Sequence, residues 1–413
     1  MYLKSLKVQH YKSLDDVSVD FAPDVTVVVG PNGVGKSNFV DVLRFLRDAV
    51  TDDLEHAVTK REGIQRLLQT YKTKPYKIGL RFDFAEKDEP DTASYMLQIA
   101  SVGSSDYRVE SEACNFLLDS LGIGRLDYDF RWTRDTKGRT EATYSFLDAN
   151  EKRTNTTSHL NEGYSPDAIA LSATPTKADS KNPIQSPMYG IIGMSIAGWN
   201  YCTIYPNTLK KPALPDRDSK LMESGDNWAS VIKALKRSPK GREALERIYD
   251  AMRAVLPTFE EVSIQTVGSY LVPLFKFRVE GETALASFDP VQLSDGTLRL
   301  FGILLAAYQL PRPKLLVIEE PEQTIYPGAL AVLADVFKEI GKNTQVLITT
   351  HSPHLVQFFE PSQIRVAVMH NGMTQIRPIH PHQLEAVNEG LLSLEEFMTT
   401  EGLRPDDTEP SSS

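Results

Sequence analysis

The chain has 413 residues, of which 24% are charged and 41% hydrophobic, the balance of an ordinary globular protein. This length exceeds that of a typical single domain, and the net charge of −10 argues against a surface coated for nucleic acid. The two cysteines favour a reducing compartment, the longest apolar run (residues 300–310) is too short to span a bilayer, and the charged start is unlike a signal peptide. We therefore expect a soluble, cytoplasmic protein.

Three strands are expected at the start of the chain, over residues 2–9, 17–21 and 25–29. The third is a β-branched run, which is typical of a strand that is buried on both faces. A helix is expected from residue 37 to about residue 50, because its apolar residues fall on one stripe. Alternating apolar residues then predict an antiparallel sheet between residues 76 and 150.

The middle of the chain gives a weaker pattern. Residues 150–225 are polar and rich in Pro, Asn, Ser and Thr, so we expect irregular connections and short helices. Two helices expected between residues 226 and 256 are too short for a long coiled-coil arm. Two further strands are expected within residues 262–279. Helices and strands then alternate, as in a parallel α/β sheet, over residues 294–310, 315–318, 327–340 and 345–350.

The strand at residues 25–29 leads into the octapeptide Gly-Pro-Asn-Gly-Val-Gly-Lys-Ser at residues 30–37, which fits the phosphate-binding loop pattern. Its glycines let backbone N–H groups turn toward phosphates, and the helix N-terminus adds its positive end. Lys36 would bridge the β- and γ-phosphates, and the Ser37 hydroxyl would bind Mg²⁺. The alternative is a glycine-rich turn with a surface lysine. The residues expected to bind nucleotide are Gly30, Asn32, Gly33, Gly35, Lys36, Ser37 and Asn38.

A second motif, Leu-Leu-Val-Ile-Glu-Glu-Pro at residues 315–321, is an apolar strand that ends in two acids and resembles a Walker B motif. A buried strand aims its last carboxylate at a metal, and the next acid can polarise an attacking water. We expect Glu319 on the metal side and Glu320 in the catalytic place. The alternative is a solvated acidic run, since Glu322 follows closely.

Two more motifs follow the glycine-rich loop along the chain, one before the acidic strand and one after it. Leu293-Ser294-Asp295-Gly296 precedes the acidic strand, and Thr350-His351-Ser352-Pro353 ends the last apolar strand. Taken together, the motifs resemble those of the RecF/SMC/OLD branch of ABC-type ATPases, which includes predicted AAA-type ATPase families. The segments that carry the resemblance are residues 6–14, 30–33, 35–38, 293–299, 319–322 and 350–353. They anchor residues 1–50 and 285–360, while the middle matches only in general layout.

The resemblance implies an ATP site completed by a second protomer, with ATP and Mg²⁺ as cofactors. Ser294 and Gly296 would contact the γ-phosphate bound by the partner, and His351 would reach the γ-phosphate of its own site. Lys12 occupies a basic position near the nucleotide in this branch, although it could equally be a surface lysine. The Q-loop glutamine is not fixed, with Gln69 as one candidate.

The chain departs from the family at residues 323–327, where Gln-Thr-Ile-Tyr-Pro replaces the usual Asn-Gly-Leu-His-Pro. This segment lies where protomers would communicate, so the departure bears on the turnover rate. The stretch after His351 is also too short for the Toprim nuclease domain of OLD-type proteins. We therefore expect an OLD-like ATPase without a nuclease of its own.

The expected fold is α/β, a P-loop NTPase of the ABC-ATPase head type with two lobes, an inserted antiparallel β subdomain and a small helical subdomain. We divide the chain into an N-terminal lobe, a β subdomain, a mixed insertion, a C-terminal lobe and a partly disordered tail, over residues 1–75, 76–150, 151–285, 286–380 and 381–413.

The expected function is an ATP-gated switch. The protein would form a homodimer or higher homo-oligomer around ATP and Mg²⁺ and control a separate effector protein, as in anti-phage systems. The alternative is a RecF-like repair ATPase that binds DNA, through basic stretches at residues 210–220 and 233–253 that could also be solvated helix faces. A transporter subunit or an AAA+ motor is disfavoured by the long gap between Lys36 and Glu319. A membrane partner is not expected.

Overall fold

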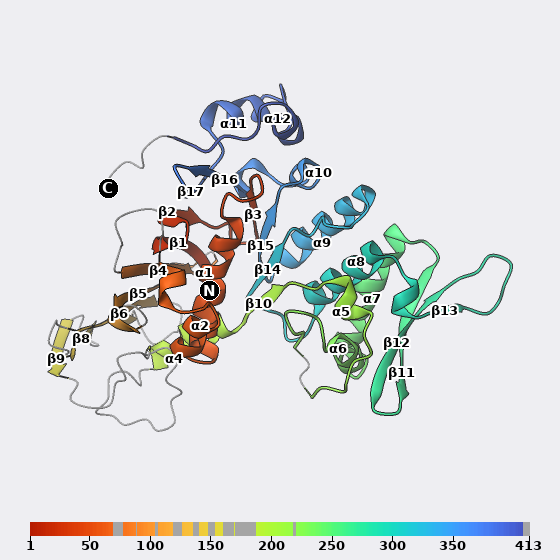
Figure 1. Cartoon of the computed structure of the whole chain (residues 1–413), viewed down its shortest axis with the longest axis horizontal. Coiled ribbons are helices and arrows are strands. Elements are labelled where there is room, and N and C mark those ends of the chain that lie inside the picture. Colours follow the sequence, from red (N-terminus) through yellow and green to blue (C-terminus); the bar gives the residue numbers. More distant parts are fainter. Residues whose placement is uncertain are drawn as a thin grey trace.

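The computed structural model describes residues 1–68, 77–87, 89–103, 106–118, 126–134, 140–147, 153–159, 169, 187–217 and 220–407 (Figure 1). Three sheets organise these residues: one of six strands, one of eight and one of three. The six-stranded sheet positions the motifs. None of the helices in the described part of the chain is long and apolar enough to cross a bilayer.

The six-stranded sheet is built around β3, all five residues of which are buried, as the β-branched run predicts. In spatial order its strands are β10 (Trp199–Cys202), β14 (Leu315–Glu319), β15 (Gln345–Thr350), β3 (Val25–Val29), β16 (Ile364–His370) and β17 (Met373–Arg377). The first five run parallel, and only β17 pairs antiparallel. The carboxyl ends of β3, β14 and β15 therefore lie at one edge of the sheet.

Residues on alternate faces of this sheet belong to two separate cores. Val28 and Leu347 pack in a cluster with the first helix, α1 (Lys36–Thr51), and with the eight-stranded sheet. Val27 and Ile348 pack on the other face in a cluster with α8 (Asp295–Tyr308). Figure 1 shows α1 and α8 on opposite sides of the sheet. The helix α9 (Leu330–Gly341) covers the same face as α8.

Strand β10 has no counterpart among the predicted elements, because residues 150–225 were expected to be irregular. The strand is only four residues long, and all four are buried, including the polar Asn200. It pairs in parallel with β14, from Trp199 opposite Leu315 to Cys202 opposite Ile318. Four residues are too few to establish an apolar run or an alternation, so the sequence pattern did not predict this strand.

The eight-stranded sheet is antiparallel throughout, in the order β2-β1-β4-β5-β6-β7-β8-β9. Its strands are β1 (Tyr2–Tyr11), β2 (Leu14–Asp20), β4 (Lys77–Ala85), β5 (Thr92–Val102), β6 (Asp106–Leu118), β7 (Leu126–Arg134), β8 (Thr140–Leu147) and β9 (Arg153–His159). Because β1 pairs with β4, this sheet continues across the boundary that we placed between residues 75 and 76. The division into five parts stays a prediction.

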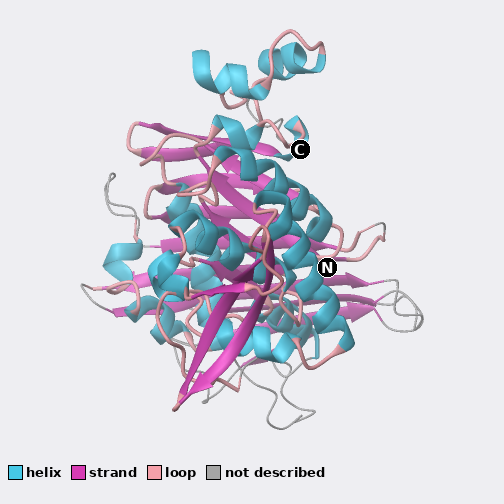
Figure 2. Cartoon of the chain, turned by 90° about the vertical axis from the view of Figure 1, so that its right-hand side faces the viewer, coloured by secondary structure: helices cyan, strands magenta, loops and turns pink. Residues whose placement is uncertain are grey.

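A group of helices and a small sheet lie beyond α8. The helices α6 (Trp228–Leu235) and α7 (Pro239–Val255) match the predicted pair, and the Ser238 hydroxyl starts α7 by accepting from the Gly241 N–H at 3.0 Å. The sheet comprises β11 (Phe259–Val267), β12 (Tyr270–Phe277) and β13 (Ala286–Phe288). Figure 2, viewed from this side, shows the β11–β12 hairpin in the foreground with helices beside and behind it.

The remaining helices are short. They are α2 (Leu54–Thr59), α3 (Ile64–Leu67), α4 (Pro187–Ala197), α5 (Pro206–Leu209), α10 (Pro353–Val356), α11 (Pro381–Asn388) and α12 (Leu394–Thr400), with 3₁₀ turns η3 (Pro290–Gln292), η4 (Pro327–Ala329) and η5 (Pro361–Gln363). The predicted tail thus begins with two helices, and its residues from 408 onward lie outside the described residues.

Candidate functional site

The glycine-rich loop joins the carboxyl end of β3 to the start of α1, as the motif requires. Gly33 and Gly35 have φ values of +83° and +97°, in the left-handed region that favours glycine. A Cβ on Gly35 would collide with the Thr374 side chain, and one on Gly30 with the Ala367 carbonyl oxygen. The loop is therefore packed tightly against β16 and β17, although Thr374 and Val34 are 340 residues apart in sequence.

A chain of hydrogen bonds ties the loop to the first hairpin. The Asn38 amide donates to the Ser13 hydroxyl at 2.7 Å, and the Ser13 hydroxyl is hydrogen-bonded to the Thr374 hydroxyl at 2.6 Å. Thr374 in turn donates to the Val34 carbonyl at 2.8 Å. Asn38 thus supports the loop through Ser13 and Thr374. Sequence reasoning missed Thr374, because nothing in its hairpin marks it as a partner of the loop.

Lys36 is buried and folds back over its own loop. Its ammonium donates to the carbonyl oxygens of Gly30 at 2.7 Å and Pro31 at 2.9 Å. Burial lowers the pKa of Lys36 below its ordinary value, while the charges of Glu320, Glu322 and Glu319 partly oppose that shift. The Lys36 ammonium therefore lies at the glycine-rich loop within the electrostatic influence of the acids that follow β14.

The paired acids stand at the end of β14, beside β15. The register places Glu319 opposite Thr349, and the Glu320 N–H donates to the Thr349 carbonyl at 2.8 Å. Glu320 has a φ of +46°, which is rare for a residue other than glycine and is held by that bond. The Glu319 side chain lies 3.4 Å from the Arg44 guanidinium. The two acids therefore occupy separate environments.

His351 lies directly beyond β15 and faces the acidic segment. Its Nδ1 is 3.5 Å from Glu320 and 3.4 Å from Glu322. The alternative of a solvated acidic run would expose Glu322, but its side chain is largely buried: it accepts from the Thr350 hydroxyl at 2.6 Å and from the His351 backbone N–H at 3.2 Å. Glu322 therefore fixes the segment that carries His351. Its neighbour Gln323 donates to Glu320.

Lys12 does not extend to the loop in this structure. Its ammonium pairs with Asp41 of α1 at 2.6 Å, and Asp41 also accepts from Arg61 at 2.8 Å and from the Tyr11 hydroxyl at 2.8 Å. The nucleotide-proximal role of Lys12 stays a prediction. Gln69, the candidate for the Q-loop, lies outside the described residues.

The Leu-Ser-Asp-Gly segment forms the start of α8. The exposed Ser294 caps that helix by accepting from the Thr297 N–H at 3.1 Å, and Asp295 pairs with Lys210 at 2.6 Å. A Cβ on Gly296 would collide with the Thr324 carbonyl, so the segment packs against the loop that follows the paired acids. Because α8 covers the sheet face opposite α1, this segment is separated from the glycine-rich loop of its own chain.

One buried arginine connects α8 to the paired acids. Arg299 donates to the carbonyl oxygens of Ile204 and, at 3.2 Å, of Glu319, so α8 is tied to the end of β14. Its Nε is buried and has no hydrogen-bond partner among the described residues. The sequence signal for Arg299 was its place in the 293–299 segment, but its partner could not be read from it.

The residues of this site fit a nucleoside triphosphate with Mg²⁺. The Lys36 ammonium donates only to carbonyl oxygens among the described residues, whereas the buried Oε2 of Glu322 has no hydrogen-bond partner there. No group of three or more His, Cys, Asp or Glu side chains in the described ranges could hold a metal by itself. Mg²⁺ commonly binds to one or two protein oxygens plus phosphates and water, and Ser37 and Glu319 are the residues that would hold it here.

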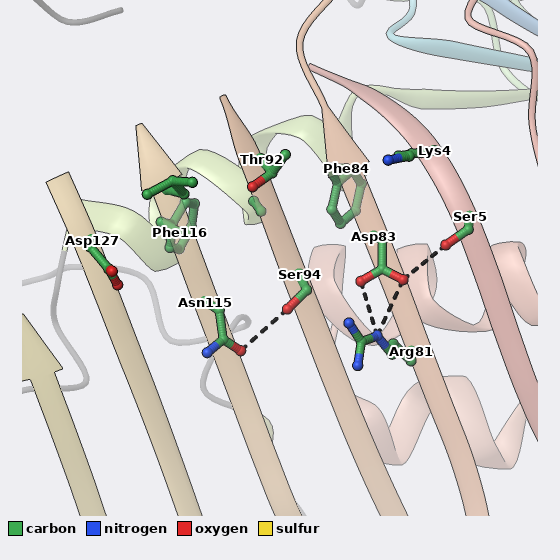
Figure 3. Close-up of a pocket in the computed structure, with 12 residues that line it drawn as sticks. Lys4, Ser5, Arg81, Asp83, Phe84, Thr92, Ser94, Asn115, Phe116 and Asp127 are labelled. Atoms are coloured by element: carbon green, nitrogen blue, oxygen red, sulfur yellow. Dashed lines mark hydrogen bonds and ion pairs between the residues drawn. The ribbon is translucent and has the colours of Figure 1, made fainter. Parts of the chain in front are cut away.

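A concavity of about 460 Å³ lies elsewhere, on the outer face of the eight-stranded sheet (Figure 3). Several of its polar groups are paired with one another: Asp83 accepts from Ser5 at 2.8 Å and from Arg81 at 3.0 Å, and Ser94 donates to Asn115 at 3.2 Å. A lining whose groups satisfy each other leaves few of them to orient a ligand, so we do not assign chemistry to it.

Comparisons with known proteins agree with this geometry. Residues 25–357 match the model of a family described as "AAA domain, putative AbiEii toxin, Type IV TA system". The chromosome partition protein Smc of Lactiplantibacillus plantarum is 28% identical over 162 residues, which are 35% of this chain and 13% of Smc. The DNA replication and repair protein RecF of Bifidobacterium longum is 29% identical over 122 residues, 30% of this chain and 27% of RecF.

The chain therefore spans only a small part of the relatives that it matches. A solved structure, the SmcHead bound to the C-winged helix domain of ScpA, covers 93% of this chain and 99% of its own, with a TM-score of 0.53 and 13% identity. That likeness shows the fold. Since the family model covers most of the chain and the relatives share its motifs, the chain belongs to this AAA-domain family and is an ABC-type ATPase of the RecF/SMC branch.

Proposed function

We propose that the protein binds ATP with Mg²⁺ and hydrolyses it as the switching step of a dimer. The observation that carries the proposal is the meeting of three strand ends: Lys36 follows β3, Glu320 follows β14 and His351 follows β15 at one edge of the sheet. The 3.5 Å separation of Glu320 and His351 and the coulombic influence of Glu320 on Lys36 support a shared site.

Each residue has a role in this proposal. The backbone N–H groups of the loop and the Lys36 ammonium bind the phosphates, and Ser37 and Glu319 hold Mg²⁺, which would neutralise phosphate charge when bound. The Glu320 carboxylate accepts the proton of the attacking water. The backbone N–H of His351 donates to Glu322, which fixes the position of this residue, and its imidazole ring would donate a hydrogen bond to the γ-phosphate.

The position of α8 supports a composite site. Ser294 and Gly296 lie on the far side of the sheet from α1, so in one protomer they are separated from Lys36. In a dimer of this fold, they would complete the partner's site, and ATP would join two protomers. The family resemblance supplies this arrangement.

The test is the Glu320→Gln variant, which keeps the size of the side chain but removes its negative charge, so that it cannot accept the proton. We expect it to bind ATP, to lose hydrolysis by at least about 100-fold and to accumulate dimers, measured by phosphate release and light scattering. Its matched control is Glu389→Gln, an exposed residue at the end of α11. An unchanged mass with bound ATP would contradict the dimer, and unchanged turnover would contradict the role of Glu320.

We further propose that dimer closure controls a separate effector protein, with anti-phage defence as its setting. The toxin–antitoxin system in the family description supports a partner-dependent role. Co-purification with the product of a neighbouring gene, retained in ATP and released in ADP, would test it. Equal retention in both nucleotides would contradict nucleotide control of the partner.

A RecF-like interaction with DNA is the second candidate, favoured by the Smc and RecF relatives and by a basic turn. Lys233, Arg237 and Lys240 are exposed at the α6–α7 turn and have no carboxylate partner in the described part of the chain. In contrast, Arg247 and Arg253 of α7 pair with acids. Changing the three turn residues to Gln should abolish a salt-dependent gel shift, and no shift by the wild type at low salt would exclude DNA binding.

A further inference from the structure

Arg44 of α1 is shared between two carboxylates from distant parts of the chain. It lies two turns along the helix from Lys36, and its Nη2 is 2.7 Å from Glu223 and 3.4 Å from Glu319. The Arg44 Nε is buried and has no hydrogen-bond partner among the described residues. The contact with Glu319 is the longer and weaker of the two, so it is the one that can open.

The contacts around Glu223 can hold Arg44 beside it. Its Oε2 is 3.3 Å from Arg47 Nη2, and its Oε1 accepts from the Thr203 hydroxyl at 3.3 Å. The guanidinium groups of Arg44 and Arg47 both lie over the ring of the buried Tyr201, at 4.8 and 4.4 Å from its centroid. The aromatic face and Glu223 therefore hold Arg44 in place whether or not it also contacts Glu319.

A divalent cation bound to Glu319 would weaken the contact between Arg44 and Glu319. The cation would approach the carboxylate that Arg44 partly neutralises, and two positive groups on one carboxylate repel each other. Building on the function proposed above, we propose that Arg44 is a positioning residue that controls metal loading at Glu319: the Arg44–Glu319 contact opens when the metal binds, and Arg44 stays paired with Glu223.

A change in the Arg44–Glu223 ion pair would affect residues outside the site, because Glu223 belongs to a segment that leads into α6. In that segment the Leu221 N–H donates to Gln309 at 3.0 Å and the Met222 N–H donates to Asn227 at 2.9 Å. Asn227 is the residue that precedes the first turn of α6. Metal loading is thereby linked to the helices beyond α8.

The test measures the Mg²⁺ concentration that gives half-maximal binding of a fluorescent, non-hydrolysable ATP analogue, which requires no turnover. Arg44→Gln should lower this concentration by on the order of tenfold, within the usual range for coupled sites. Glu223→Gln should raise it, because Arg44 is then left with Glu319 as its nearest carboxylate. The matched control is Arg47→Gln, which alters the same helix, the same aromatic ring and the same Glu223 but no contact with Glu319.

The two shifts of opposite sign identify the mechanism. Equal shifts for Arg44→Gln and Arg47→Gln, or shifts in one direction for Arg44→Gln and Glu223→Gln, would overturn the proposal. Should Arg44→Gln fail to fold, the rise expected for Glu223→Gln still decides. If the wild type does not bind the analogue at all, the proposed function itself fails; if it binds with a Mg²⁺ requirement that these variants leave unchanged, only the inference about Arg44 fails.

Hydrogen exchange reports the linked movement independently of affinity. Adding Mg²⁺ to the analogue-bound wild type should change the protection of residues 220–235, and the Glu223→Gln variant should lose that change. An identical response in both proteins would show that Glu223 does not carry the coupling.

Discussion

At the scale of one residue, the burial of Lys36 is unfavourable for folding but favourable for binding a phosphate. Its ammonium is buried over the carbonyls of Gly30 and Pro31, and burial lowers its pKa. Burying a charge destabilises a fold unless a partner compensates it, and the carbonyls compensate only in part. The same desolvation strengthens the interaction with a phosphate, because fewer waters compete for it.

Lys36→Met should therefore separate binding from folding. We expect the ATP affinity to fall by on the order of 100-fold, or about 2.8 kcal/mol, which lies within the range for truncating one partner of a buried charged contact. The midpoint of thermal unfolding without nucleotide should stay equal or rise. Calorimetric titration and thermal unfolding measure the two effects, with the exposed Lys342→Met as control. Unaltered ATP affinity would contradict the assignment of the loop.

Helix α1 shows at the scale of an element how a motif is kept in place. Behind the loop, Asp48 is almost fully buried and receives Arg47 at 3.0 Å, Arg61 at 3.1 Å and Lys60 at 3.2 Å. Burial alone would raise the pKa of Asp48, but its basic partners, Arg47 first, outweigh burial and lower it. Ion pairs from Asp48 to Lys60 and Arg61 thus anchor α1 to the segment after α2, and none of these residues belongs to the glycine-rich loop.

The Asp48 anchor should be visible in the pH dependence of stability. A carboxyl whose pKa is lowered by folding contributes stability above its unfolded pKa, and loses that contribution as the pH falls through its folded pKa. Asp48→Asn should lower the free energy of unfolding by about 3 kcal/mol at pH 7 and reduce the loss of stability below about pH 4. Urea unfolding at both pH values measures this, with the exposed Asp52→Asn as control. Parallel acid profiles for Asp48→Asn and the wild type would contradict it.

At the scale of the whole molecule, the sheet separates two functional surfaces. The loop and α1 lie on one face, and α8 with its exposed Ser294 lies on the other. Under the proposed function, a single protomer would bind nucleotide, while only a pair of protomers would enclose it, because the fold keeps the two surfaces apart. The Arg299 link from α8 to Glu319 connects the two surfaces within one protomer.

Ser294→Asp tests this separation without damaging the helix. Aspartate caps a helix as well as serine does, so α8 should be retained, but its charge would face the phosphate bound by the partner. We expect monomers to bind ATP with unchanged affinity and ATP-dependent dimers to disappear, measured by calorimetry and light scattering. The neutral cap Ser294→Asn should still dimerise. Loss of ATP binding by the Ser294→Asp monomer would instead place Ser294 in its own site.

The sequence alone determined the strands and helices that carry the motifs and the branch of ATPases to which the chain belongs. Short, contiguous patterns such as the β-branched run at residues 25–29 and the glycine loop after it encode their own local structure, and they were readable for that reason. The tertiary structure decided which distant groups meet. Thr374 supports the loop, Glu322 fixes the His351 segment, and Glu223 shares Arg44 with Glu319. These contacts join residues that are far apart in the chain, so no local periodicity records them, and only the packing of the strands brings them together.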